Sequence, residues 1–231
     1  MEHVDRKKQA VGEKAAEYIQ DGMLVGLGSG TTMYYMLQAL GDRVKKGLHI
    51  RGVPSSVKTE KWANEFGIPL TDFSEVDQLD IAIDGADEID PAFNLIKGGG
   101  GSLLREKIVD MAADRFIVVA DDRKQVDRLG AFPLPIEVVQ FGWQLTKKNI
   151  EALGCSTVLR EEDGQVFITN NDNYILDCQF EAIHEPKKLH EQLKQLLGVV
   201  ETGLFFDIVD DVLIGRDDGV EVLKDSVYEY K

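Results

Sequence analysis

Short apolar runs alternate with amphipathic segments along the first half of the chain. We expect strands at residues 23–27, 49–53, 79–83 and 116–120, and helices at residues 5–20, 31–40, 59–66 and 102–113. Short strands that alternate with helices are typical of βαβ units and of a parallel sheet. The pattern therefore predicts an α/β fold with a Rossmann-like parallel sheet domain.

The pattern changes at the Phe-Pro-Leu-Pro segment, residues 132–135. From there we expect a strand at 136–139, a helix at 144–153, a strand at 156–160, a hairpin through 166–169 and 174–178, a helix at 186–197 and a strand at 199–204. This βαββαβ order is that of a ferredoxin-like α+β domain. We assign residues 1–130 and 207–231 to the Rossmann-like domain and residues 131–206 to the smaller ferredoxin-like domain.

Charge and cysteine content narrow the possible functions. The 231 residues carry a formal net charge of -15, which disfavours nucleic acid and anionic lipid as partners. The apolar runs are far shorter than the ~20 residues of a membrane span. Cys155 and Cys178 stand alone and the N-terminus has no apolar core typical of a signal peptide, so we expect a cytoplasmic protein with reduced thiols.

Glycines and hydroxyl residues follow the first predicted strand, in the segment 26–32. Glycine lets the backbone approach an anion, and the amides at a helix N-terminus point towards it, so Ser29, Gly30, Thr31 and Thr32 are candidates for binding phosphate. Thr31 stands where a dinucleotide fingerprint has glycine, and the lysine of a Walker motif is missing. A tight turn with a Ser/Thr helix cap is the alternative.

Acidic residues follow the third predicted strand. Ligands of open α/β sheets bind beyond the carboxyl ends of the strands, so Asp84 and Asp87 are expected in that crevice. Carboxylates there can hold sugar hydroxyls or transfer protons. A magnesium site and simple turn or helix capping are two other interpretations.

A run of four glycines, residues 98–101, lies between Lys97 and a predicted helix. One or two glycines suffice for a turn, so the run favours a ligand close to the backbone. Ser102 can cap the helix, which puts Glu106 about one turn inside it. An exposed helical position is the alternative for Glu106, and a solvated loop is the alternative for Lys124 at the fourth strand end. The four histidines lack ligand spacing, so we expect no zinc site.

Four motifs occur in order along the chain, and together they resemble one family. They are GLGSGTT at 26–32, DGADEID at 84–90, KGGGGSLLREK at 97–107 and DDRKQVDRLGAFPLP at 121–135. With these motifs the chain is similar to the type A ribose-5-phosphate isomerases over essentially its whole length. The resemblance implies interconversion of D-ribose 5-phosphate and D-ribulose 5-phosphate through an enediolate, in the non-oxidative pentose phosphate pathway. It also implies an enzyme without metal or other cofactor, usually a homodimer or a dimer of dimers.

The resemblance also implies roles for individual residues. Glu106 matches the general base, Lys97 would neutralise the oxyanion, and Asp84 and Asp87 would handle hydroxyl protons and help open the sugar ring. Substrate contacts are implied for Lys8, Ser29, Gly30, Thr31, Thr32, Asp84, Gly85, Ala86, Asp87, Lys97, Gly98, Gly99, Gly100 and Lys124. The N-terminal lysine of the family matches Lys7 or Lys8, and counting back from Gly12 favours Lys8. The tail at 225–231 matches no motif.

Two other classes of protein could use the same crevice. A sugar-phosphate-sensing module of a transcription regulator would need an attached DNA-binding segment, and this acidic chain has no basic helix-turn-helix. A CoA transferase would use a glutamate as nucleophile rather than as base. The short chain and the position of Lys97 beside the glycines favour a phosphate ligand over CoA.

Overall fold

A computed structural model describes residues 3–224, which form two compact units. Within the described residues, the first unit consists of residues 3–86, 105–124 and 208–224, and the second consists of residues 87–104 and 125–207. This division differs from the predicted one in three places, one of which is Asp207, the last residue of the second unit. The segment 87–104 belongs to the second unit, and the later boundary falls at Gln125 rather than at residue 131. The tail at 225–231 lies outside the described residues.

A six-stranded sheet forms the centre of the first unit, in the order β15-β14-β6-β3-β1-β2. Its parallel strands are β1 (Leu24–Leu27), β2 (Arg51–Pro54), β3 (Ile81–Gly85), β6 (Phe116–Asp121) and β14 (Asp211–Arg216), and β15 (Gly219–Lys224) is antiparallel to β14. The four strands expected in the first half of the chain are all present, so the prediction of a parallel α/β sheet is confirmed. The C-terminal pair β14–β15 had not been predicted.

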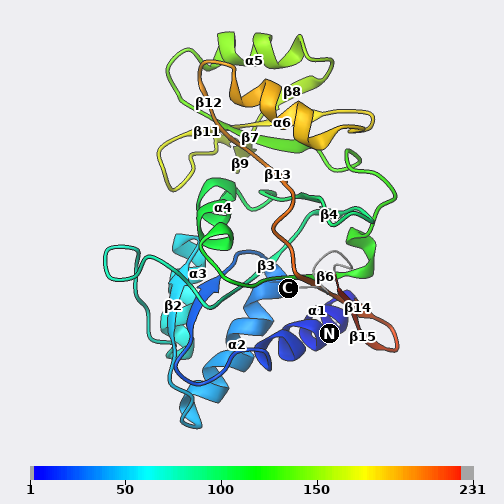
Figure 1. Ribbon diagram of the computed structural model, residues 1–231. Helices are drawn as coiled ribbons and strands as arrows, with labels where there is room; N and C mark the ends of the chain where they lie inside the picture. The colour runs from blue at the N-terminus through cyan, green and yellow to red at the C-terminus, as the bar shows by residue number, and fades with distance from the viewer. Residues whose placement is uncertain (1–2, 225–231) are drawn as a thin grey trace. The chain divides into compact units, whose positions relative to one another are not determined.

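Helices pack on both faces of this sheet because successive strand residues point to opposite sides. The helices α1 (His3–Ala16), α2 (Thr31–Lys45) and α3 (Val57–Phe66) share one apolar core with Val25 and Leu27 of β1. Val109 of α4 (Leu103–Met111) instead packs with Val53 and Leu79 in a separate cluster. Figure 1 shows α1 and α2 running side by side in this unit, as their shared core requires.

The second unit contains the predicted ferredoxin-like arrangement. Its elements are β7 (Leu134–Val138), α5 (Trp143–Glu151), β8 (Ser156–Leu159), β11 (Tyr174–Gln179), α6 (Pro186–Lys194) and β12 (Val199–Thr202). The strand order is β12-β7-β11-β8, and all neighbours are antiparallel. Leu193 of α6 and Ile150 of α5 are fully buried in the core of this sheet.

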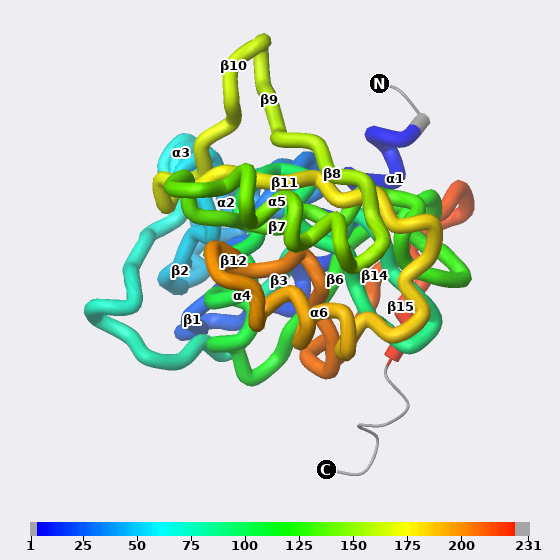
Figure 2. Tube along the Cα trace, turned by 90° about the horizontal axis from the view of Figure 1, so that it is seen from above, coloured from blue at the N-terminus to red at the C-terminus, as the bar shows by residue number. Residues whose placement is uncertain are grey.

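Two small features of the second unit differ from the prediction. The hairpin is formed by β9 (Glu161–Glu162) and β10 (Gln165–Val166), not by residues 166–169 with 174–178, because β11 pairs with β7 and β8 instead. Figure 2 shows this hairpin extending away from β8 and β11. A three-stranded sheet of β4 (Glu88–Ile89), β5 (Leu95–Ile96) and β13 (Leu204–Phe205) had not been expected.

The helices of the described part of the chain are short. Between residues 3 and 224, none is long and apolar enough to cross a membrane.

Candidate active site

The strand order of the first unit defines where a ligand is expected. Strands β2 and β3 lie on opposite sides of β1, so the order in which successive strands are added to the sheet reverses there. Ligands of open parallel sheets bind at the carboxyl ends of the strands beside such a switch point. Gly28 and Ser29 follow β1, and Asp84 lies at the end of β3. The predicted phosphate and carboxylate motifs therefore meet at the switch point of the sheet.

The loop after β1 leads directly into the N-terminus of α2. Gly30 precedes the helix with φ of 100°, a left-handed conformation that favours glycine, and no side chain caps this helix end. Thr31 is exposed, and the Nζ atom of Lys8 lies 2.8 Å from its Oγ1 atom. Uncapped amides, hydroxyls and an ammonium group together form a site that suits a phosphate.

Asp84 is fully buried and holds this loop against β3. Its Oδ1 atom accepts hydrogen bonds from the backbone N–H groups of Ser29 (2.8 Å) and Gly85 (2.6 Å). An ideal Cβ atom on Gly28 would lie 2.2 Å from the Asp84 carboxyl group, so only glycine fits there. One oxygen of the predicted sugar-binding carboxylate thus has a structural role.

The two N-terminal lysines have different surroundings. The Nζ atom of Lys7 lies 2.8 Å from a carboxylate oxygen of Asp122 and 2.8 Å from one of Asp217. Hydrogen bonds to Asp122 and then Asp217 hold the pKa of Lys7 above its ordinary value. Lys8, in contrast, contacts Thr31 at the start of α2. This geometry favours Lys8 as the lysine of the candidate site.

Glu106 and Lys124 also belong to the first unit. Glu106 lies in the first turn of α4 and is only 4% exposed, so the alternative of an exposed helical position is wrong. A carboxylate in the first turn is stabilised by the helix dipole, whereas burial disfavours its charge. Lys124 is half-buried and ends the 3₁₀ helix η1 (Asp122–Lys124) directly after β6.

Asp87 and Lys97 lie in the second unit. The Oδ2 atom of Asp87 accepts a 2.7 Å hydrogen bond from the N–H group of Gly99. Lys97 is only 2% exposed, its N–H group donates to the carbonyl oxygen of Gly203 (2.9 Å), and its Nζ atom lies 5.3 Å from the ring centre of Phe205. Lysine side chains are rarely buried to this extent, and a cation over an aromatic ring is attracted to the face of that ring.

Backbone conformation and packing within the chain explain most of the glycine run. Gly98 and Gly101 have φ of 100° and 81°, and a Cβ atom on Gly99 would lie 2.7 Å from the Asp87 carboxylate. Gly100 alone has open space around its missing side chain. Arg160 supports the run by donating to the carbonyl oxygens of Gly98 (2.9 Å) and Gly99 (3.2 Å). Ligand approach is therefore not needed to explain three of the four glycines.

The predicted residues are divided between the two units. The first contains Lys8, Ser29, Gly30, Thr31, Thr32, Asp84, Gly85, Ala86, Glu106 and Lys124, and the second contains Asp87, Lys97, Gly98, Gly99 and Gly100. Contacts join Lys8 to Thr31, Ser29 to Asp84, and Asp87 to Gly99. Sequence reasoning missed Ser55, Thr59, Arg160 and Phe205, which support these residues. Their contacts join distant segments, and no local pattern indicates them.

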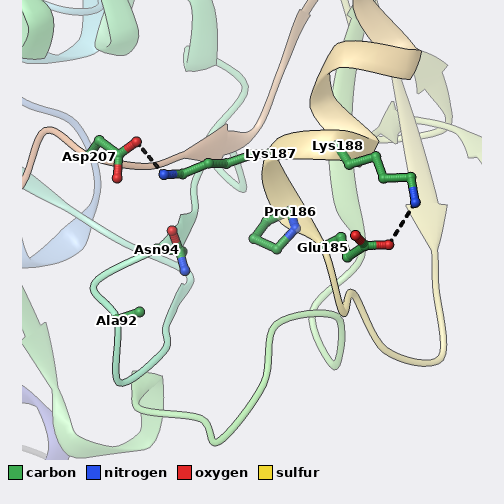
Figure 3. A pocket seen from close by; sticks show the side chains of 7 residues that line it. All are labelled: Ala92, Asn94, Glu185, Pro186, Lys187, Lys188 and Asp207. Atoms are coloured by element: carbon green, nitrogen blue, oxygen red, sulfur yellow. Dashed lines mark hydrogen bonds and ion pairs between the residues drawn. The ribbon is translucent and has the colours of Figure 1, made fainter.

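A cavity of about 350 Å³ lies elsewhere in the second unit, beside the N-terminus of α6 (Figure 3). None of its lining residues is a predicted site residue. Both of its lysines contact carboxylates, Lys187 with Asp207 at 2.5 Å and Lys188 with Glu185 at 2.9 Å. The cavity therefore offers no uncompensated positive charge for a phosphate. Within residues 3–224, His, Cys, Asp and Glu side chains form no group of three suited to a metal ion.

The fold and the site define a class of protein, an α/β enzyme of small phosphorylated metabolites. Comparison with known proteins identifies the family. The model of the family "Ribose 5-phosphate isomerase A (phosphoriboisomerase A)" matches residues 51–219. The chain therefore belongs to the ribose 5-phosphate isomerase A family, whose members are aldose–ketose isomerases of a pentose phosphate.

Individual relatives match over nearly their whole length. Ribose-5-phosphate isomerase A 1 of Oceanobacillus iheyensis is 51% identical, and the match covers 96% of this chain and 100% of that protein. The structure of ribose 5-phosphate isomerase A from Methanocaldococcus jannaschii has a TM-score of 0.92 and 37% identity, and covers 96% and 99% of the two chains. A D-ribose-5-phosphate isomerase in complex with phospho-erythronic acid has a TM-score of 0.93 and 38% identity, and covers 97% and 100%.

Proposed function

We propose that this protein interconverts D-ribose 5-phosphate and D-ribulose 5-phosphate with Glu106 as its base. The observation that carries the proposal is the buried carboxylate of Glu106 in the first turn of α4, in the unit that also has an uncapped phosphate-binding loop. Glu106 removes the proton from C2 of the open-chain aldose and returns it to C1. One base suffices because the two carbons are adjacent and share the enediolate intermediate.

The phosphate group is bound by the first unit. The N-terminal amides of α2, the hydroxyl group of Thr31 and the ammonium group of Lys8 provide donors, and Lys124 adds a second positive charge. A local positive site is needed because the chain as a whole has a formal net charge of -15. These contacts exist in the ground state and in the transition state alike, so they set affinity rather than turnover.

Lys97 and the two aspartates act on the oxygen atoms of the sugar. Lys97 stabilises the negative charge that develops on the enediolate oxygen, and electrostatic stabilisation of this kind is usually the largest contribution to catalysis. Its side chain is buried, and its Nζ atom lies 5.3 Å from the ring centre of Phe205. Asp84 and Asp87 exchange protons with the sugar hydroxyls and assist ring opening.

The ligand of a related structure supports this chemistry. The isomerase that is 38% identical to this chain was solved with phospho-erythronic acid. That molecule is a phosphorylated sugar acid, and its planar carboxylate resembles the enediolate in shape and charge. A transition-state-like ligand of this kind is expected to bind tightly to the proposed site.

The direct test is formation of ribulose 5-phosphate from ribose 5-phosphate by the purified protein in excess EDTA. We expect full turnover, because the proposed mechanism assigns the oxyanion to Lys97 and uses no metal. Turnover that is lost in EDTA and restored by magnesium or manganese would contradict the metal-free mechanism. Absence of turnover with and without metal would contradict the proposed activity itself and favour a sugar-phosphate-binding module.

We further propose a homodimer that works in the cytoplasm, in the non-oxidative pentose phosphate pathway. Free thiols at Cys155 and Cys178 suit a reducing compartment. Phe141, two residues before α5, and Leu145 in α5 are 95% and 66% exposed, so this part of the second unit offers two large apolar side chains to a second copy of the chain. Analytical ultracentrifugation should give twice the chain mass of 25.7 kDa. A single species at the chain mass would contradict the dimer.

A further inference from the structure

A second strand-to-helix turn contacts the candidate phosphate loop, residues 28–30 between β1 and α2. It follows β2 and leads into α3, and it belongs to the same unit as the loop. The N–H group of Ser55 donates to the carbonyl oxygen of Leu27 at 2.9 Å, and the Oγ1 atom of Thr59 donates to that of Gly28 at 2.9 Å. The Oγ atoms of Ser55 and Ser29 lie 2.9 Å apart. Three consecutive residues, from Leu27 to Ser29, are thus held by this turn and the first turn of α3.

The opposite side of the loop is bound to β3. The N–H group of Gly28 donates to the carbonyl oxygen of Ile83 at 2.9 Å, and that of Ser29 donates to Asp84 at 2.8 Å. The N–H and carbonyl groups of Gly28 and the N–H group of Ser29 therefore all form hydrogen bonds within the protein. We expect the amides that face an incoming anion to begin at Gly30, the residue before α2, so their direction should depend on how Gly28 is held.

The hydroxyl protons of Thr59 and Ser56 have a definite direction. Ser56 accepts from the N–H group of Thr59 at 3.0 Å, and its hydroxyl group lies 2.9 Å from the Oγ1 atom of Thr59. Since the single proton of Thr59 points to Gly28, Ser56 must donate to Thr59. Ser29 lies near Ser55 (2.9 Å) and Thr59 (3.3 Å), and only Ser55 has a proton left to give it.

This direction matters when a phosphate is bound. A phosphate dianion only accepts hydrogen bonds, so Ser29 must donate to it and must accept from within the protein. Ser55 is the group that can supply this hydrogen bond. Ser55 and Thr59 are both fully buried, so water does not compete for them and neither reaches the ligand.

We infer that Thr59 and Ser55 are positioning residues of the phosphate site. Thr59 fixes the Gly28 carbonyl group and so aims the amides that follow it, and Ser55 orients the hydroxyl group of Ser29 towards the phosphate. The inference rests on the proposed function, because it assumes that a sugar phosphate binds at this loop. It assigns specificity for the phosphate group partly to residues that never touch it.

The test compares Thr59→Val, which keeps the shape and removes the hydroxyl group, with Thr59→Ser, which keeps the hydroxyl group. Inorganic phosphate is the probe, as a competitive inhibitor of isomerisation. For Thr59→Val we expect the inhibition constant and KM to rise together, roughly three- to tenfold, the worth of one hydrogen bond. The value of kcat should stay within about twofold, since the phosphate contact is uniform binding. Thr59→Ser should have the KM and the inhibition constant of wild type. Ser55→Ala should show the same rise in both constants as Thr59→Val.

Thr71→Val is the matched control. Thr71 is also a buried threonine of the first unit, but its hydroxyl group donates to Glu75 (2.9 Å), away from the loop. We expect some loss of stability in this variant with wild-type phosphate inhibition, which separates positioning from general destabilisation.

Several outcomes would overturn the inference. These are a folded Thr59→Val enzyme with wild-type phosphate inhibition, a Thr59→Ser enzyme as impaired as Thr59→Val, or a fall in kcat at constant KM. If Thr59→Val does not fold, Ser55→Ala decides, and wild-type inhibition in that variant overturns the inference. Wild-type protein without isomerase activity would instead contradict the proposed function, so the two failures are distinguishable.

Discussion

Replacement of Gly28 by alanine tests the close contact between the phosphate loop and β3. The new Cβ atom would lie 2.2 Å from the Asp84 carboxyl group and 2.5 Å from its Cα atom. Backbone movement cannot relieve the overlap cheaply, because Gly28 donates to Ile83 and accepts from Thr59, each at 2.9 Å. The loop must therefore separate from β3 and weaken the hydrogen bond between Ser29 and Asp84.

The cost follows from these contacts. Overpacking costs about 1–3 kcal/mol, and a weakened hydrogen bond adds about 1 kcal/mol. We therefore expect Gly28→Ala to lower the free energy of unfolding of the first unit by about 2–4 kcal/mol, the sum of these two contributions. The affinity for phosphate should fall as well, because the displaced loop no longer aims the amides of α2.

The chain allows this unfolding to be followed in one unit. It has two tryptophans, Trp62 in α3 of the first unit and Trp143 in α5 of the second. In a Trp143→Phe background, urea denaturation followed by tryptophan fluorescence reports on the first unit alone. Gly85→Ala, in β3 of the same unit, is the control for stability, since the nearest atom to the added Cβ lies at 3.5 Å, an ordinary contact distance. If Gly28→Ala unfolded at the parent's urea midpoint with the same m value, the close contact would be refuted.

Two further predictions concern a positive charge and a thiol. Lys124→Ala should raise KM about 10- to 100-fold at nearly constant kcat, which is the worth of a hydrogen bond to a charged group. The KM of this variant should also depend less on salt than that of wild type. An unchanged KM would mean that Lys124 is a solvated loop residue that does not contact the phosphate. Cys155 should be alkylated by iodoacetamide with a rate that rises through a pH of about 7, because hydrogen bonding to Cys178 lowers the pKa of the Cys155 thiol to about 7. An alkylation rate that rises only near pH 9 would contradict the lowered pKa of Cys155. Cys178 is fully buried and should stay unmodified.

Much of the fold could be predicted because the strands of the first unit are short apolar runs. The prediction of secondary structure failed where tertiary contacts override local sequence signals. The helix was expected to end at about residue 40, just before Gly41, yet α2 continues to Lys45. Position 41 is glycine for a packing reason, since a Cβ atom there would lie 2.7 Å from Phe66 of α3. The two-residue strands β4, β5 and β13 are too short to show any periodicity.

The candidate site was predictable to the extent that its residues follow strands. Asp84 and Ser29 were placed at strand ends from sequence alone, and the structure puts them at the switch point of the sheet. The hydroxyl groups of Ser55 and Thr59 gave no signal, since a Ser-Ser segment before a helix is simply a good cap. The glycine run indicated a ligand, whereas the structure shows that packing and backbone conformation require most of it.

The central claim is that Glu106 is the base, and Glu106→Gln tests it most directly. The amide is nearly isosteric and keeps one acceptor oxygen, so the fold and the affinity for a five-carbon phosphate analogue, measured by calorimetry, should be preserved. Turnover should fall by at least ~10²–10⁴-fold, the usual worth of a positioned general base. The decisive measurement is exchange of the C2 proton of ribose 5-phosphate in heavy water, followed by NMR. We predict that exchange collapses in parallel with turnover. A variant that binds the analogue and still exchanges this proton at a near wild-type rate would contradict the mechanism and leave Asp84 or Asp87 as the base.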